Sequence, residues 1–265
     1  MNTAHRRCSL RSRAVAKSSG TALISVLLIV IGLNGPAVQP AFSQQIAART
    51  NGDSQDQFPL YQPPKKFTPR ARVGGELRGT EGTDPEVQAL VPDHVGFTSS
   101  QTPVLNWYLS RITPHEVRFT LIDNQSVRPL FEAPIPTPKQ PGIFSISIKD
   151  LGLALDPNIQ YRWYVSVVRD PSSPSKDIVG GGVIERCEMS DCLITFDAKI
   201  TCSVQTVTEN ARAGFWYDAM GCLCTLIDAN PTDASLRRLR AGLLKQVGLN
   251  GVAEWDLRSV QAQQR

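Results

Sequence analysis

The sequence has few of the side chains on which most hydrolases and metal enzymes depend. Its 265 residues include only three histidines, His5, His94 and His115. It has no G-x-S-x-G turn that would present a nucleophilic serine, and no C-x2-C pair of the kind that holds zinc. We therefore predict no catalytic residues, no metal site and no cofactor, and expect the protein not to be an enzyme.

Long apolar runs are also scarce, and the one that exists lies near the N-terminus. Residues 21–33 are apolar at nearly every position, about 20 Å of helix against a hydrocarbon core of about 30 Å. Small residues at Ala41 and Ser43 predict cleavage between Ser43 and Gln44. We expect residues 1–43 to be a secretory signal and the protein to be periplasmic or secreted. An anchor that is not cleaved is the alternative. The basic residues before the run are Arg6, Arg7, Arg11, Arg13 and Lys17.

The mature chain lacks an excess of charge of either sign. The whole sequence has 28 Lys and Arg against 24 Asp and Glu, a net charge of +4. Residues 1–43 hold five of the basic residues and no acidic one, so 23 basic residues face 24 acidic ones after cleavage. The basic character belongs to the signal, and we expect no nucleic acid partner. Contact with a membrane is expected only through the signal segment before cleavage.

Residues 44–66 are rich in polar residues and proline, and we expect a flexible leader there. Residues 67–188 are different, because apolar and polar side chains alternate with a period of two. Turn formers such as Asp156-Pro157-Asn158 separate the segments. This pattern predicts a mostly β domain, built as an antiparallel β-sandwich of the immunoglobulin or fibronectin type. The expected strands are residues 104–109, 116–123, 129–133, 142–148, 161–169 and 178–185.

Three aromatic residues are predicted to fill the core of this sandwich. Leu155, Pro157 and Tyr161 have the spacing of a tyrosine corner, in which a phenol bonds to backbone a few residues upstream. Trp163 follows on the same face of the strand, and Trp107 has a similar setting in an earlier strand. We expect Trp107, Tyr161 and Trp163 to be core residues rather than a surface for ligands.

The period becomes helical after a cysteine-bearing connector at residues 189–205. Residues 206–250 predict a helical hairpin, because apolar residues recur at helical spacing on both sides of Asn230-Pro231-Thr232-Asp233. The hairpin resembles a single tetratricopeptide element, and a lone repeat must pack on something else, which we expect to be the sandwich. Residues 251–265 are expected to form a frayed tail.

Several short phrases, taken in order, resemble a family of exported proteins known mainly from cyanobacteria, the domain of unknown function numbered 928. The resemblance covers roughly residues 66–250. It implies export and no established activity, and it transfers no catalytic residue. The phrases are Lys66-Phe67-Thr68-Pro69-Arg70, Arg72-Val73-Gly74-Gly75, Ala89-Leu90-Val91-Pro92, Trp107-Tyr108-Leu109, Pro141-Gly142-Ile143, Tyr161-Arg162-Trp163-Tyr164, residues 181–186, Trp216-Tyr217-Asp218-Ala219 and Val247-Gly248-Leu249.

Five cysteines remain after removal of the signal: Cys187, Cys192, Cys202, Cys222 and Cys224. Disulfides are permitted in an exported protein, and an odd count leaves one thiol over. We predict a Cys187–Cys192 bond, and a second bond from Cys202 to either Cys222 or Cys224 that joins sandwich to helices. Metal or redox sensing through Cys222 and Cys224 is an alternative use.

The sequence predicts an exported, non-enzymatic interaction or accessory module of the cell envelope, whose partner is another envelope or secreted protein. Edge strands or loops of the sandwich would form the binding surface. The alternative is an envelope enzyme that acts on glycans through two carboxyl groups about 5–9 Å apart. The candidate carboxylates border the last two strands and are Asp170, Asp177, Glu185 and Glu188.

Overall fold

The computed structural model describes residues 59–63, 71–74, 84–187 and 201–263. The chain divides into two units, residues 1–52 and 53–265, and all described residues belong to the second. The predicted signal at 1–43 and its cleavage point at Ser43 and Gln44 lie outside the described residues. Within these residues, no helix is both long enough and apolar enough to span a membrane.

A five-stranded sheet forms one layer, and the period of two in the sequence explains its two faces. In strand β4 (Glu116–Asp123), Val117, Phe119 and Leu121 are fully buried, whereas Arg118 and Thr120 between them are partly exposed. The same alternation holds in strand β7 (Gln160–Val168), where Trp163 and Val165 face inward. In spatial order the sheet contains β5 (Phe131–Ile135), β4 (Glu116–Asp123), β7 (Gln160–Val168), β8 (Ile178–Arg186) and β2 (Gly96–Thr98).

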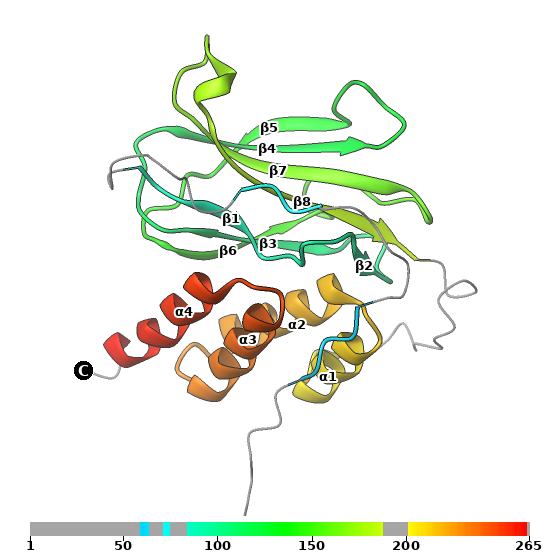
Figure 1. Cartoon of the computed structure of the whole chain (residues 1–265), viewed down its shortest axis with the longest axis vertical. Helices are drawn as coiled ribbons and strands as arrows, with labels where there is room; N and C mark the ends of the chain where they lie inside the picture. Colours follow the sequence, from blue (N-terminus) through cyan, green and yellow to red (C-terminus); the bar gives the residue numbers. More distant parts are fainter. Residues whose placement is uncertain (1–58, 64–70, 75–83, 188–200, 264–265) are drawn as a thin grey trace, which may run out of the picture. The chain divides into compact units, whose positions relative to one another are not determined.

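A three-stranded sheet forms the second layer, in the order β1 (Val87–Ala89), β3 (Val104–Leu109) and β6 (Gly142–Ser147). The two sheets lie face to face (Figure 1). Leu105, Trp107 and Leu109 of β3 are buried in the same apolar cluster as the inward residues of the first sheet. Trp107 packs on Phe144 of β6 with ring centroids 5.3 Å apart. The two sheets therefore share one apolar core, which is what the alternating segments require.

Three consecutive glycines in β8 let neighbouring groups approach its backbone closely. A Cβ added to Gly180 would lie 2.6 Å from the carbonyl oxygen of Val87, so β1 crosses directly over this point. A Cβ on Gly182 would meet Val91, and one on Gly181 would meet the ring of Tyr164 on the outer face. The glycines are thus required by packing on both faces of the strand.

Four helices follow, and they cover the outer face of the three-stranded sheet (Figure 1). The side chain of Ser203 accepts a hydrogen bond from the Thr206 amide at the start of the first helix, and Asp233 does the same for Ser235 at the start of the third. Gly248, at φ 76°, ends the third. The helices are α1 (Val204–Arg212), α2 (Trp216–Ala229), α3 (Ala234–Gln246) and α4 (Asn250–Gln263).

The fold is therefore mostly β with a helical C-terminus, as predicted, and three details differ. The first sheet is mixed, because β2 runs parallel to β8. The helical part contains four helices rather than a hairpin, and the expected frayed tail is α4. Trp255 of α4 packs on Tyr108 of β3, with ring centroids 5.2 Å apart, and this contact gives the segment a surface to fold on.

Candidate functional site

The three aromatic residues singled out in the sequence lie in the core. Trp107 and Tyr161 are buried and Trp163 is fully enclosed. The hydroxyl of Tyr161 accepts a hydrogen bond of 3.0 Å from the amide of Asp156, five residues upstream. Burial raises the pKa of this hydroxyl. These residues support the sandwich and are not available to a ligand.

A buried hydrogen-bond chain joins the first sheet to α2. Trp163 Nε1 donates to the hydroxyl of Tyr217 over 2.9 Å, and this hydroxyl donates to the carbonyl of Val183 over 3.1 Å. Trp216, the preceding residue, donates from Nε1 to the carbonyl of Leu90 over 2.8 Å. Desolvation raises the pKa of Tyr217, so the phenol stays neutral and can donate and accept at once.

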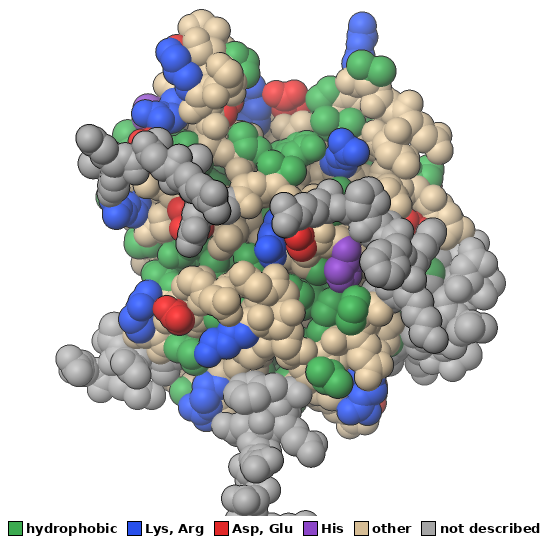
Figure 2. Space-filling model, in the orientation of Figure 1, with side chains coloured by type: hydrophobic (Ala, Val, Ile, Leu, Met, Phe, Trp, Pro, Cys, Tyr) green, Lys and Arg blue, Asp and Glu red, His purple; other side chains and the backbone are tan. Residues whose placement is uncertain are grey.

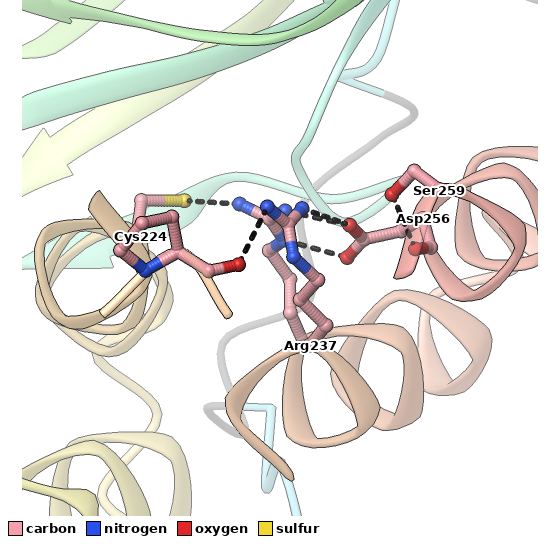
Figure 3. A network of polar contacts seen from close by, with 6 residues as sticks. Cys224, Arg237, Asp256 and Ser259 are labelled. Atoms are coloured by element: carbon pink, nitrogen blue, oxygen red, sulfur yellow. Dashed lines mark hydrogen bonds and ion pairs between the residues drawn. The ribbon is translucent and has the colours of Figure 1, made fainter. Parts of the chain in front are cut away.

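A charged network lies between α2, α3 and α4 (Figure 3). Arg240 makes two hydrogen bonds of 2.7 Å to the carboxylate of Asp256, and Arg237 makes a third of 3.2 Å. Arg240 also approaches the sulfur of Cys224 at 3.4 Å. Asp256, Arg240 and Cys224 are buried, and the side chain of Arg237 is 12% exposed. A buried pair of this geometry fixes the register between two helices, and we assign it a structural role.

The cysteines differ from the predicted arrangement in one respect. Cys187 is disulfide-bonded, but Cys192 lies outside the described residues, so the Cys187–Cys192 pairing stays a prediction. Cys202, Cys222 and Cys224 are free thiols, so the expected second bond is not formed. Cys224 faces Arg240, whereas Cys222 faces Cys202 within hydrogen-bond reach.

The thiols on α2 do not have the properties of a reactive or metal-binding site. Burial, followed by the neighbouring Cys202, raises the pKa of Cys222 to about 12. Burial also raises the pKa of Cys224, although Arg240 opposes the shift. Both groups are therefore protonated at neutral pH, which is unfavourable for sensing. The described residues contain no group of three or more His, Cys, Asp or Glu placed to hold a metal ion.

Among the described carboxylates that the glycan-enzyme alternative names, Glu185 lies far from Asp170 and Asp177. Asp177 precedes β8 and Glu185 lies near its other end, about 26 Å away at ~3.3 Å per residue. Hydrogen bonds from Ser172 and then from Lys176 lower the pKa of Asp170 to about 2, so it stays ionised in its turn. Glu188 lies outside the described residues. Asp170 and Asp177 belong to one loop, in which the amide of Arg169 donates to the Asp177 carboxylate over 3.3 Å and the amide of Ser172 donates to Asp170 over 3.0 Å.

A short segment of the predicted leader, residues 59–63, lies instead against the helices (Figure 1). The side-chain amide of Gln246 on α3 binds its backbone twice. Oε1 accepts from the Tyr61 amide over 2.8 Å, and Nε2 donates to the Pro59 carbonyl over 2.9 Å. The Gln62 amide donates to the carbonyl of Ala211, the second-last residue of α1, over 3.1 Å. The helices therefore hold this segment by three main-chain hydrogen bonds.

One aromatic side chain anchors the segment. Tyr61 is buried, with its ring edge against Trp216 at 4.9 Å and its face stacked on His94 at 5.9 Å. Its hydroxyl lies 3.4 Å from Nε2 of His94, and the other ring nitrogen of His94 lies 2.8 Å from the Val95 carbonyl. Burial raises the pKa of Tyr61. We call the surface formed by His94, Ala211, Trp216 and Gln246 the peptide groove.

The peptide groove is neutral in character. Its contacts come from an amide side chain, a backbone carbonyl and aromatic rings. Figure 2 shows that Lys and Arg side chains are spread over the visible face rather than gathered into one basic patch. Sequence reasoning missed this site because the leader is mainly polar. Local sequence gives no signal for it, because Pro59 and Leu60 are both apolar and only the structure shows that Pro59 and Tyr61 are buried while Leu60 and Gln62 are exposed.

Comparison with protein families accounts for nearly all of the described structure. The family model described as Domain of Unknown Function (DUF928) matches residues 73–257. The chain belongs to this family. The match begins at Val73, which pairs with Gly181 of β8, and ends in α4 directly after Asp256. It therefore includes both sheets, the charged network and the helical side of the peptide groove, but not residues 59–63.

Other comparisons add little. No curated protein matches the chain. Among solved structures, a multi-domain immunophilin from Arabidopsis thaliana is 11% identical, with a TM-score of 0.16. That comparison covers 76% of this chain and 100% of the other. A likeness at this level supports no conclusion about fold or activity.

Proposed function

We propose that this protein is an exported, non-enzymatic accessory module of the cell envelope that binds another envelope or secreted protein. The observation that carries the proposal is the peptide groove, in which helices α1 and α3 bind three backbone groups of a short segment. Binding through main-chain atoms is a general way to recognise a polypeptide. The signal pattern at residues 1–43 supports the envelope location.

The finer architecture also belongs to this proposal. We regard the two sheets as an immunoglobulin- or fibronectin-like sandwich, supported by the hydrogen bond between Tyr161 and Asp156. We regard α2 and α3 as a tetratricopeptide-like hairpin joined at residues 230–233. A helical hairpin on a sandwich offers a binding surface without catalytic groups. The glycan-enzyme alternative is not carried further, because Glu185 lies near the opposite end of β8 from the loop that holds Asp170 and Asp177.

Export is tested by expressing the full chain with a C-terminal tag in a Gram-negative host and separating periplasm from cytoplasm. The purified periplasmic form is expected to begin at Gln44 by N-terminal sequencing. A chain that keeps residues 1–43 and sediments with membranes would support the uncleaved anchor instead.

Partner binding is tested by chemical crosslinking in intact cells that naturally produce the protein, followed by tag purification and mass spectrometry. The candidate is then purified separately and mixed with the exported chain. We expect a complex of fixed stoichiometry that survives 0.15 M salt, since the groove is neutral and screening has little effect on it. Failure of every crosslinked candidate to bind in purified form would contradict the proposed function.

A further inference from the structure

The peptide groove is already filled in this structure, and its occupant belongs to the same chain. Residues 59–63 form no helix and no strand, yet they are bound in the manner of an added strand. The carbonyl of residue i and the amide of residue i+2 point to the same side of an extended chain. Gln246 binds this pair at Pro59 and Tyr61 with one side-chain amide, as the backbone of a neighbouring strand would do.

We propose that residues 59–63 are an internal ligand, and that the peptide groove opens to receive an extended, tyrosine-anchored segment of the partner protein in their place. This inference rests on the proposed function and deepens it, because it names the site and the chemical class of its ligand. Residues 59–63, which occupy the peptide groove in this structure, define the class of ligand. Their buried positions are Pro59 and Tyr61, whereas Leu60 has 57% of its surface exposed.

The contacts determine what a ligand must supply. A ligand needs one phenol ring to fill the space between Trp216 and His94, and an extended backbone to satisfy Gln246 and the Ala211 carbonyl. The residue between the anchors is unrestricted, because Leu60 points to solvent. A charged side chain at the tyrosine position would lose its hydration on burial between the two rings, so we expect a neutral anchor.

The same contacts explain why the segment can leave. It is held by three hydrogen bonds to its backbone, by the contact of the Tyr61 hydroxyl with His94 and by the buried side chains of Pro59 and Tyr61. In contrast, β7 is paired along its length on both sides, by β4 and β8. Segments with few buried contacts open at a lower free energy than core strands do. An internal ligand also competes at the effective concentration set by its own chain, so an added peptide binds weakly until the internal anchor is removed.

The test uses a fluorescein-labelled peptide with the sequence of residues 59–63, Pro-Leu-Tyr-Gln-Pro, and the purified exported chain. Binding is measured by fluorescence anisotropy to the wild type, to Tyr61→Ala and to the matched control Leu60→Ala. We expect Tyr61→Ala to bind the peptide at least about tenfold more tightly than the wild type or Leu60→Ala, because its own segment has lost the anchor. A peptide with alanine in place of tyrosine should bind Tyr61→Ala at least about tenfold more weakly.

The outcome that would overturn the inference is a folded Tyr61→Ala chain, shown by an unchanged near-ultraviolet circular dichroism spectrum, that binds neither peptide or both equally. If Tyr61→Ala does not fold, hydrogen exchange of the wild-type chain tests the inference instead. The Tyr61 and Gln62 amides should exchange faster than the Val165 amide in β7, and exchange of all three amides only through global unfolding would also overturn the inference.

The outcomes for this inference and for the proposed function can be told apart. If the partner still binds while the peptide does not, this inference fails and the proposed function stands. If the peptide binds but no partner is found, the proposed function fails.

Discussion

At the residue scale, the hydroxyl of Tyr217 both accepts and donates a hydrogen bond. It accepts from Trp163 in the first sheet and donates to the carbonyl of Val183, and it is the link between that sheet and α2. The close approach is possible because Gly96 has no side chain. A Cβ there would lie 2.6 Å from the Tyr217 ring. Gly96 therefore leaves room for the ring of Tyr217 against the sheet, and the hydroxyl of Tyr217 makes the two hydrogen bonds from α2 to the sheet.

Replacement of Tyr217 by phenylalanine is predicted to destabilise the protein. Tyr217→Phe keeps the ring but leaves Trp163 Nε1 and the Val183 carbonyl buried without this partner, at a cost of about 1–3 kcal/mol in the free energy of unfolding. Urea denaturation followed by circular dichroism measures the change. Tyr164→Phe is the matched control, since its ring lies on the outer face of the sheet. Equal effects of the two variants would contradict the assigned role.

At the element scale, the closeness of β1 to β8 depends on the absence of side chains at two glycines. The register pairs Val165 with Gly180 and Trp163 with Gly182, so the glycines leave room beside the two large inward side chains of β7. The sequence shows the run of three glycines but not its purpose. Their purpose becomes visible only when β1, about ninety residues earlier in the chain, lies across them.

Substitution in the glycine run should therefore be costly. Gly180→Ala would place a methyl group 2.6 Å from the backbone oxygen of Val87, and the strands must separate to relieve the contact. We expect a loss of about 1–3 kcal/mol of unfolding free energy. Gly251→Ala is the matched control, because an added Cβ there has no atom within 4 Å. Since Gly251 lies in α4, this control should leave stability unchanged or raise it by up to about 1 kcal/mol.

The helices α3 and α4 are joined by a carboxylate between two guanidinium groups. Asp256→Asn removes the only negative charge that an ion pair supplies to Arg237 and Arg240 among the described residues. The two buried cations then lack a counter-charge, and we expect a loss of about 3–5 kcal/mol in a denaturation experiment. Glu254→Gln, on the exposed side of the same helix, should change stability by less than about 0.5 kcal/mol. A small effect of Asp256→Asn would show that the network contributes little.

At the scale of the whole molecule, the sandwich and the helices share a single apolar interior. One continuous cluster of buried side chains contains Trp163 of the first sheet, Trp107 of the second and Leu223, Leu243 and Val252 of the helices. The helices pack on the sheets, as expected from the sequence for the helical hairpin. The helices cover a sheet face that would otherwise be apolar and exposed.

This shared core predicts unfolding in a single step. Tryptophan fluorescence reports mainly on the core, and far-ultraviolet circular dichroism at 222 nm reports mainly on the helices. We expect the two urea transitions to coincide, with one midpoint and one slope. A helical signal lost at lower urea than the fluorescence signal would show that the helices form an independent unit.

Local patterns in the sequence were sufficient for much of this fold. Six of the eight strands in the described part of the chain, and the change from strands to helices, follow from side-chain period and turn residues, because each depends on neighbours along the chain. The tyrosine corner was also predictable, since Asp156 and Tyr161 are five residues apart. The short strands β1 and β2 were not predicted, because three residues show no clear period.

The sequence by itself determined where strands, turns and most helices form in this protein, since those choices are made by interactions among nearby residues. It also contains the family pattern and the signal-like N-terminus. Only the tertiary structure decided that residues 59–63 are bound, that 250–263 is helical and that the glycine run is crossed by β1. Each of these three features depends on a contact between residues far apart in the chain, such as Tyr61 with Gln246 and Trp255 with Tyr108. The residues next to each of them in the sequence do not indicate that such a contact forms.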